Sequence, residues 1–249
     1  MPVGMSAATE AGETNPVCSR LESVTCPLSV RRRQLDTGTA VVTCMTRTVW
    51  AVRHGQRRDT VDPDFHTYAD RIHDPDLTEF GRWQAWRVGR FFAEAGTDVE
   101  SIFASPFLRT VQTADEICRE LGATFELEAG LGEHRNAEWF DSDPETADPA
   151  DLAAWFETLR LGRESVVVPA FPESHADAER RVGETTRRLV DDASGSILLV
   201  GHGLTIGGVV RGLVGSTDGV DAPLCGLTRI DRVDGEWTLA YSGRTDHLE

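Results

Sequence analysis

Short, almost continuously apolar segments alternate along this chain with longer segments in which apolar residues recur every three to four positions. The apolar runs have the length of buried strands and lie at residues 47–52 (RTVWAV), 101–105 (SIFAS) and 196–201 (SILLVG). Helical spacing predicts helices at residues 78–95, 149–161 and 174–193, and another after residue 203. This alternation predicts an α/β fold of three layers, with a mostly parallel central sheet and helices on both of its faces.

Residues that start or stop helices and turns refine these boundaries. Ser105 is expected to cap a helix whose first residue is Pro106, and Gly122 to end that helix. A strand is expected near residues 123–128, and Asp234-Gly235 predicts a hairpin between two closing strands. Within the helix at residues 78–95, one apolar stripe is expected to hold Phe80, Trp83, Val88, Phe91 and Phe92.

Residues 1–44 differ from the rest of the chain. They show no sustained periodicity and are rich in Ser, Thr, Gly and Pro. We expect either a disordered extension or a mis-assigned start, with translation beginning at Met45, and a single domain at residues 45–249. The arginines at 31–33 are not followed by the apolar region of a secretory signal.

The charge balance limits the classes of partner. The chain has 25 basic residues, all of them Arg, and 41 acidic residues, which gives a formal net charge of −16. Such an acidic surface repels nucleic acid and anionic lipid, so neither is expected as a partner. It resembles the surfaces of halophile proteins, which are screened by salt. No apolar stretch reaches the length of a membrane span.

The five cysteines do not form a recognisable framework. Their number is odd and no pair has CxxC spacing. We therefore expect a reduced, cytoplasmic setting, in which Cys118 and Cys225 are small core residues.

Two histidines have the same setting at the ends of two apolar strands. His54 in VRHGQR and His202 in LLVGHG each precede a glycine. Because ligands of open α/β sheets bind beyond the carboxyl ends of the strands, both are expected to face one crevice. The side chains that match phosphate oxygens there are Arg53, Arg57 and Arg109, and the start of the helix that carries Arg109 also favours an anion. This pattern predicts a phosphate site with an imidazole placed for attack on phosphorus.

Two other uses of these residues are disfavoured. A zinc site would need HxxxH spacing or a nearby Cys or carboxylate pattern, and neither is present. A Ser-His-Asp hydrolase would need a GxSxG elbow, which is also missing. We expect no metal and no other cofactor.

The ordered set of motifs resembles that of the histidine phosphatase superfamily, which has the phosphoglycerate-mutase-like fold. The resemblance covers roughly residues 47–243 and rests on RHGQR, LTEFGRWQA, SPFLRTVQTA, the Glu of AGLGEH, ESHADAERRV and VGHG. The RHG start and the SPFLRTVQTA block are most similar to the branch that includes the TULA-type tyrosine phosphatases, without their accessory domains.

The resemblance implies a role for each residue of the pocket. His54 is the nucleophile that becomes phosphohistidine, and Glu133 is the proton donor. The phosphoryl oxygens are held by Arg53, Arg109 and His202, with Arg57 as a fourth contact. Gln56 departs from the family pattern, where Glu is frequent, and we expect little loss from it.

Other conspicuous residues are expected to have structural roles. Packing in or near the core is expected for Trp83, Trp86, Trp155 and Trp237. His66 and His73 either border the pocket or lie on the surface, and surface placement is favoured. Glu173-Ser174 either helps to order the pocket or caps a helix. A solvated acidic segment is expected at Asp141, Asp143, Glu145, Asp148 and Asp151.

The favoured function is a metal-independent phosphomonoesterase of the histidine acid phosphatase type, acting on a small phosphorylated substrate. A phosphoglycerate mutase is the main alternative. It is disfavoured because the insertion after RHG and the segment at 136–175 are mainly acidic. A non-catalytic module that only binds phosphorylated ligands is a further alternative. It is disfavoured because such a module would not need to retain both His54 and Glu133. A homodimer is left open.

Overall fold

The computed structural model describes residues 47–249, so the expectations for residues 1–44 and for Met45 fall outside the described part. A seven-stranded sheet has the order β4-β3-β2-β5-β1-β6-β7. Its strands are β1 (Arg47–Arg53), β2 (Ser101–Ala104), β3 (Phe125–Leu127), β4 (Leu159–Arg160), β5 (Ile197–Gly201), β6 (Leu227–Val233) and β7 (Glu236–Arg244). The pairs among β1 to β5 are parallel, and β6 pairs antiparallel with both β1 and β7, which confirms the mostly parallel sheet.

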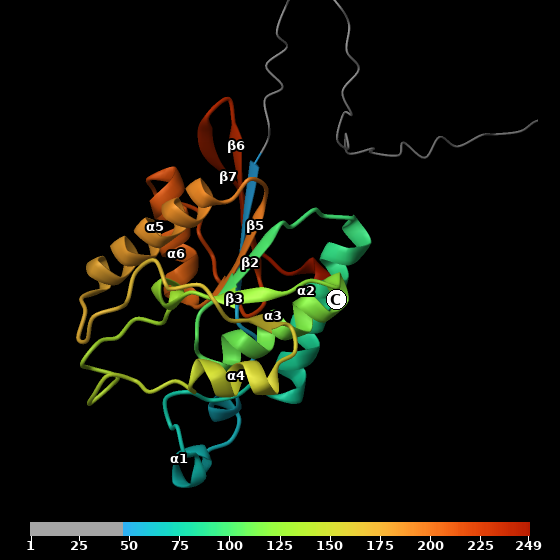
Figure 1. Cartoon of the computed structure of the whole chain (residues 1–249). Helices are drawn as coiled ribbons and strands as arrows, with labels where there is room; N and C mark the ends of the chain where they lie inside the picture. The colour runs from blue at the N-terminus through green and yellow to red at the C-terminus, as the bar shows by residue number, and fades with distance from the viewer. Residues whose placement is uncertain (1–46) are drawn as a thin grey trace, which may run out of the picture. The chain divides into compact units, whose positions relative to one another are not determined.

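Helices cover both faces of this sheet (Figure 1). They are α1 (Phe65–Tyr68), α2 (Glu79–Ala95), α3 (Leu108–Leu121), α4 (Pro149–Trp155), α5 (His175–Asp192) and α6 (Gly203–Val214), with 3₁₀ turns at Arg58–Thr60, Ala129–Leu131 and Asp246–Leu248. Alternate residues of β1 enter two cores: Trp50 packs with Phe92 of α2, and Val49 lies in the cluster that holds Val182 of α5. The three-layer α/β prediction is confirmed.

The register of the two central strands brings the candidate histidines together. β1 pairs with β5 so that Arg53 lies opposite Gly201. The backbone N–H of His54 donates to the carbonyl of Gly201 at 2.9 Å. His54 and His202 therefore leave the sheet side by side at the same edge.

The predicted apolar stripe of α2 is partly wrong. Phe80 and Trp83 are exposed and stack on each other with ring centroids 5.4 Å apart. The buried face near the helix start is instead formed around Gly81, because the loop after His54 packs there. A Cβ added at Gly55 would lie 2.4 Å from the Gly81 carbonyl oxygen, so this contact requires glycine.

The predicted start of the third helix is also wrong. α3 begins at Leu108, its N-cap is Phe107, and no side chain of that N-cap residue caps it. Ser105 lies two residues before the N-cap, where its hydroxyl hydrogen bonds to Nε2 of His202, 2.9 Å away, and accepts the backbone N–H of Phe107 at 3.5 Å. Gly122 ends the helix in the left-handed conformation, as predicted.

Three further expectations have mixed outcomes. α4 ends at Trp155, six residues before the expected boundary, and Trp155 is exposed, whereas Trp86 and Trp237 are half-buried. Asp234 and Gly235 both have positive φ and form the predicted hairpin turn. Cys118 and Cys225 are buried free thiols, as expected.

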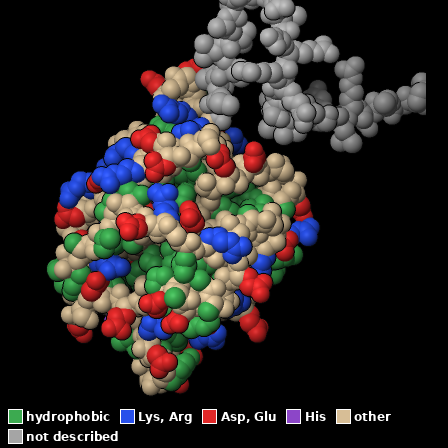
Figure 2. Space-filling view, in the orientation of Figure 1, with side chains coloured by type: hydrophobic (Ala, Val, Ile, Leu, Met, Phe, Trp, Pro, Cys, Tyr) green, Lys and Arg blue, Asp and Glu red, His purple; other side chains and the backbone are tan. Residues whose placement is uncertain are grey.

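Charged side chains of both signs are interspersed on the face shown in Figure 2, with hydrophobic side chains between them. The predicted acidic segment from Asp141 to Asp151 has all five of its acidic side chains exposed. Within residues 47–249, no helix has both the length and the apolar character that a membrane crossing requires.

Candidate active site

His54 presents one ring nitrogen to the site. The side chain is 2% exposed, and its Nδ1 lies 2.8 Å from the carbonyl oxygen of Gly55. A carbonyl can only accept, so Nδ1 carries the proton and Nε2 keeps its lone pair. Burial and the nearby charge of Arg109 hold the pKa of His54 well below its usual value. His54 is therefore a neutral imidazole with a free Nε2, the form required of a nucleophile.

His202 is fixed from several sides. Its Nε2 lies 2.9 Å from the Ser105 hydroxyl, and its ring contacts Phe107 edge-on at 5.2 Å. The Thr205 hydroxyl accepts the backbone N–H of His202 at 2.8 Å. Complete burial lowers the pKa of His202 to about 4. The ring centroids of His54 and His202 are 5.4 Å apart, so the two imidazoles share one site, as predicted.

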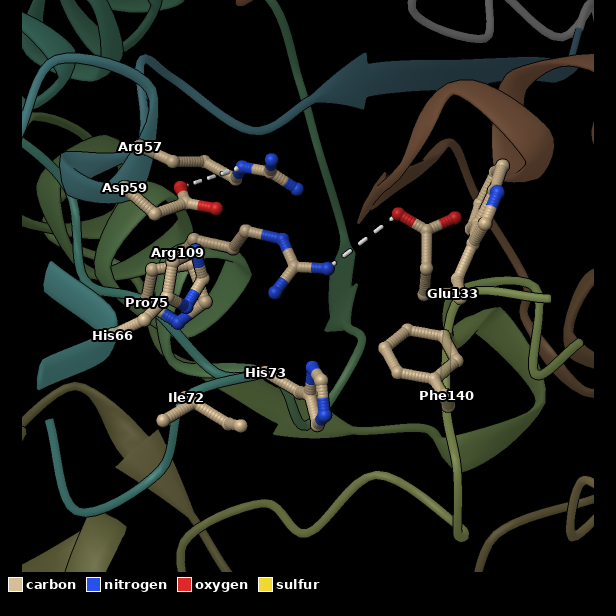
Figure 3. A pocket seen from close by; sticks show the side chains of 10 residues that line it. Arg57, Asp59, His66, Ile72, His73, Pro75, Arg109, Glu133 and Phe140 are labelled. Atoms are coloured by element: carbon tan, nitrogen blue, oxygen red, sulfur yellow. Dashed lines mark hydrogen bonds and ion pairs between the residues drawn. The ribbon is translucent and has the colours of Figure 1, made fainter. Parts of the chain in front are cut away.

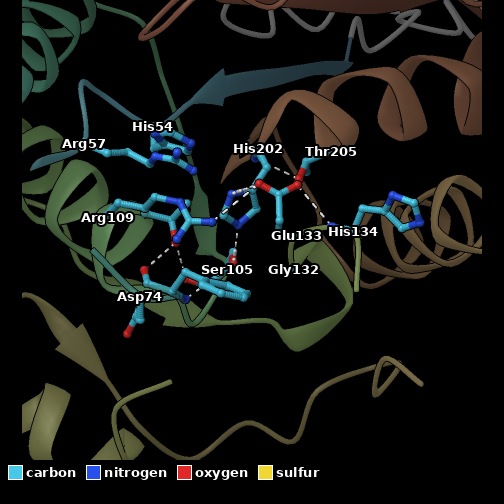
Figure 4. Close-up of polar contacts among 12 residues, drawn as sticks. His54, Arg57, Asp74, Ser105, Arg109, Gly132, Glu133, His134, His202 and Thr205 are labelled. Atoms are coloured by element: carbon cyan, nitrogen blue, oxygen red, sulfur yellow. Dashed lines mark hydrogen bonds and ion pairs between the residues drawn. The ribbon is translucent and has the colours of Figure 1, made fainter. Parts of the chain in front are cut away.

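Glu133 connects His202 to the arginine beside it (Figure 4). Its Oε2 lies 3.3 Å from Nδ1 of His202 and 3.4 Å from Nη2 of Arg109, and its Oε1 accepts the N–H of His134. Burial would raise the pKa of the Glu133 carboxyl, but His202 and Arg109 hold it well below its usual range. In the free site Glu133 is therefore a carboxylate.

Arg109 is buried beside these groups and has unused donors. It is 1% exposed, and no side chain or backbone group among residues 47–249 accepts from its Nε or Nη1. A buried guanidinium with unsatisfied N–H groups is costly unless an acceptor binds there. The side chain extends from the first turn of α3, which Asp74 holds: its Oδ1 accepts the N–H of Leu108 at 2.6 Å. The anion that meets this helix start in the structure is thus the Asp74 carboxylate.

The other two arginines lie at the mouth of the site. Arg53 donates to the Ala222 carbonyl through Nη1 at 2.8 Å, while its buried Nε has no acceptor among the described residues. Arg57 is partly exposed, with Nε 3.0 Å from Asp59. All six predicted site residues are thereby brought to one edge of the sheet.

Two cavities adjoin this cluster. The smaller, of about 200 Å³, is lined by Arg57, Arg109, Glu133 and aromatic or apolar side chains (Figure 3). The larger, of about 490 Å³, is lined by Arg53, Arg57, Glu133 and the start of α6. His66 and His73 both line the smaller cavity, which was the less favoured alternative. His66 is also exposed, as expected, whereas His73 is half-buried against Phe140.

The segment that carries Glu133 is anchored from α5. Arg181 donates to the carbonyl oxygens of Gly130 and Glu133, at 2.8 and 3.2 Å, and is paired with the buried carboxylate of Glu173 at 2.6 Å. Ser174 caps α5 by accepting the N–H of Asp177. Glu173 therefore helps to order the pocket while Ser174 caps the helix, so both expectations for this pair hold.

Three residues of the site were missed in the sequence. Ser105 contacts His202, Asp74 holds the start of α3, and Trp139 lines both cavities. The position of Ser105 directly after a strand was a usable signal. Asp74 and Trp139 lie in irregular segments, where periodicity carries no information about contacts.

His54, Glu133 and His202 also meet a distance criterion for a metal site. One ligand atom from each lies within 4.8 Å of the others. The Glu133 oxygen nearest to His202 is, however, also the one that faces Nη2 of Arg109. A divalent cation bound there would compete with that guanidinium for the same oxygen.

The sequence model of the Histidine phosphatase superfamily (branch 1) matches residues 49–245. The chain belongs to the histidine phosphatase superfamily. This confirms the resemblance that the RHG, SPFLRTVQTA and GHG motifs indicated.

Relatives of this histidine phosphatase include longer proteins. The Ecdysteroid-phosphate phosphatase of Drosophila melanogaster is 26% identical over 186 residues, which are 67% of this chain and 24% of that protein. The human Ubiquitin-associated and SH3 domain-containing protein A, which is of the TULA type, is 27% identical over 214 residues, or 70% of this chain and 32% of that protein. The chain thus spans about a quarter to a third of the length of these relatives.

Solved structures share the fold. The ecdysone phosphate phosphatase of the silkworm Bombyx mori, in complex with tungstate, has a TM-score of 0.68 at 22% identity, covering 80% of this chain and 93% of that one. The phosphoglycerate mutase of Bacillus anthracis has a TM-score of 0.57 at 17% identity, covering 82% and 96%. These similarities confirm the phosphoglycerate-mutase-like fold.

Proposed function

We propose that this histidine phosphatase is a metal-independent phosphomonoesterase that forms a phosphohistidine on His54. The observation that carries the proposal is the pairing of a free imidazole nitrogen with unused guanidinium donors. Nε2 of His54 is left unprotonated by the bond from Nδ1 to Gly55, and the buried Arg109 beside it has two nitrogens without an acceptor among the described residues.

The arginines supply the charge that a metal would otherwise provide. Phosphoryl transfer needs stabilisation of negative charge on the equatorial oxygens and in-line positioning. Arg109 and the unpartnered Nε of Arg53 offer N–H donors, and Arg57 adds charge at the mouth. Guanidinium groups bind phosphate oxygens through charge-assisted hydrogen bonds that are stronger than neutral ones.

In the first step, Nε2 of His54 attacks phosphorus and the ester P–O bond breaks. The electron pair of that bond goes to the leaving oxygen, which needs a proton. Glu133 is a carboxylate in the free site, so it takes up a proton when the negative phosphoryl group binds nearby, and then donates it. This refines the proton-donor role expected from the family resemblance.

In the second step, water attacks the phosphohistidine. Glu133, again a carboxylate, accepts a proton from the water as the new P–O bond forms. The N–P bond breaks and its electron pair returns to Nε2 of His54. His202, fixed by Ser105, lies beside the phosphoryl group through both steps.

The lining of the cavities supports hydrolysis over mutase chemistry. A mutase must hold a substrate carboxylate and return the phosphoryl group to it. The arginines that line the two cavities are the three already assigned to the phosphoryl group, and the other nitrogen-bearing side chains of the two linings are histidines and Trp139. A second anionic group on the substrate would instead meet Glu133, Asp59 or Glu179.

A phosphorus NMR assay tests the proposal. Purified full-length chain is incubated with an alkyl phosphate and with 3-phosphoglycerate, with and without EDTA. We expect inorganic phosphate from the alkyl phosphate at the same rate in EDTA, and no isomerised phosphoglycerate. Rapid isomerisation with little phosphate release would contradict the phosphatase assignment, and loss of activity in EDTA would contradict metal independence.

A further inference from the structure

The two cavities meet at one exposed aromatic side chain. Trp139 lines both of them and is 60% exposed, although large aromatic side chains usually bury most of their surface. It contacts the His134 ring edge-on at 5.7 Å, and His134 contacts His175 in the same way at 5.6 Å. Three rings joined by two consecutive contacts thus lie beside the proposed phosphoryl site.

His134 has little polar capacity left for a ligand. Its Nε2 donates to the Glu173 carbonyl at 3.1 Å, and its Nδ1 accepts from the Asn136 amide at 3.2 Å. The imidazole therefore offers mainly its ring to the cavity. In the smaller cavity the corresponding surfaces are Ile72, Pro75 and Phe140.

One wall of the larger cavity, here called the glycine floor, is formed by Gly203, Leu204 and Gly207 on the first turns of α6. An added Cβ at Gly207 would meet only the Glu179 Oε1 atom, at an ordinary 3.6 Å. The protein itself thus leaves room at this position.

Charges in the cavities disfavour an anionic leaving group. Asp59 is paired with Arg57, and Glu179 lies 3.0 Å from Arg211. An anionic ligand that bound either arginine would therefore have to replace an existing ion pair. A carboxylate placed beside Asp59, Glu133 or Glu179 would lie next to a like charge, which is unfavourable.

We propose that Trp139 is a specificity-determining residue, and that the leaving group is a small uncharged alcohol bearing an apolar ring, packed on Trp139 above the glycine floor of α6. This inference rests on the proposed function, because it assigns the part of the substrate beyond the phosphoryl group. It excludes sugar acids and bisphosphates as preferred substrates.

Three primary alkyl phosphates of similar intrinsic reactivity test it: 2-phenylethyl phosphate, propyl phosphate and 3-phosphonooxypropanoate. We expect kcat/KM to be about tenfold higher for the phenylethyl ester than for the propyl ester, as one aromatic contact provides. The carboxylate ester should be the poorest. Equal values for the phenylethyl and propyl esters, or a preference for the carboxylate, would overturn the inference.

Substitutions test which residues cause the preference for the phenylethyl ester over the propyl ester. Trp139→Ala should reduce the phenylethyl-to-propyl ratio to near one, and Gly207→Leu should reduce it by filling the floor. The matched control is Trp155→Ala, which removes another exposed tryptophan and should keep the wild-type ratio. An unchanged ratio in Trp139→Ala would overturn the assignment of Trp139, and an unchanged ratio in Gly207→Leu would overturn the placement of the ring above α6.

A binding measurement separates this inference from the proposed function. Calorimetry with His54→Ala compares the Kd values of the same three esters without turnover. If the wild-type chain hydrolyses none of them, the phosphatase proposal fails, while about tenfold tighter binding of the phenylethyl ester still supports the ring site. Equal Kd values for the phenylethyl and propyl esters would overturn the ring site even in an active phosphatase.

Discussion

The carboxylate of Asp74 accepts the backbone N–H of Leu108, 2.6 Å away, and so holds the first residue of the helix that carries the buried arginine. Asp74 is itself 3% exposed and lies 3.4 Å from Arg71. Burial raises the pKa of Asp74, while the Leu108 amide and Arg109 act in the opposite direction. The insertion after the RHG motif thus contacts the start of the helix that carries Arg109.

Removing this tie should affect substrate binding more than the fold. Asp74→Ala removes an acceptor at a helix start, which costs about 1 kcal/mol of stability, and frees the helix start that positions Arg109. We expect KM for an alkyl phosphate to rise severalfold. Asp74→Asn keeps an acceptor for the Leu108 N–H and should lie between the alanine variant and wild type. Steady-state kinetics of both variants checks this, and equal KM values for Asp74→Ala and wild type would refute it.

The effect of replacing Glu133 on kcat/KM should depend on the leaving group of the substrate. Glu133→Gln should lower kcat/KM for an alkyl phosphate by about 10²–10⁴-fold, since an alkoxide needs a proton as it departs. It should largely spare para-nitrophenyl phosphate, whose phenolate leaves without help. The constant to compare is kcat/KM, because it reports the steps up to transfer onto His54. If both substrates slow equally, Glu133 organises the pocket and the proton donor lies elsewhere.

The buried His202 should make the protein sensitive to acid. Its pKa is about 4 in the folded state and about 6.5 when unfolded. As pH falls from 6.5 to 4, the unfolded chain therefore takes up a proton that the folded chain does not. The free energy of unfolding should decrease over this window, by roughly 3 kcal/mol from this group, with no further loss from it below pH 4.

Urea unfolding at several pH values measures this effect. His202→Gln should have a shallower pH dependence between pH 6.5 and 4 than wild type. The exposed His66→Gln serves as the control and should follow wild type. An unchanged slope in His202→Gln would show that other groups control acid stability.

The net charge of −16 should make stability depend on salt. At molar KCl the Debye length falls to about 3 Å from about 10 Å at 0.1 M, which screens repulsion among surface acids. We expect the melting temperature of the full chain to rise between 0.1 and 2 M KCl. Scanning calorimetry tests this, and a falling melting temperature would argue against the halophile-like interpretation.

The periodic patterns of apolar residues in the sequence predicted the regular strands and helices of the fold. Apolar strands next to glycine placed His54 and His202 at one sheet edge, because parallel strands share their carboxyl ends. The start of α3 was not predictable from its local residues. Ser105 is a residue type that favours helix N-caps, but its hydroxyl contacts His202, which lies 97 residues away in the chain.

Long-range contacts also explain what was missed in the pocket. Trp139 and His73 lie in irregular segments, far apart in the sequence, that line one cavity with Glu133 in the folded chain. The exposure of Phe80 likewise follows from the close packing of Gly55 on Gly81, in which the helix meets the loop through its smallest residue. Neither contact leaves a periodic signal.

Trapping the covalent intermediate tests the central claim most directly. The full chain is mixed with an alkyl phosphate, quenched in base within milliseconds, digested and analysed by mass spectrometry, with His54→Ala as the control. We predict an acid-labile, base-stable phosphate on His54 in the wild-type chain and none in the variant, together with loss of hydrolysis. Phosphate on another residue, or normal turnover by His54→Ala, would contradict the account.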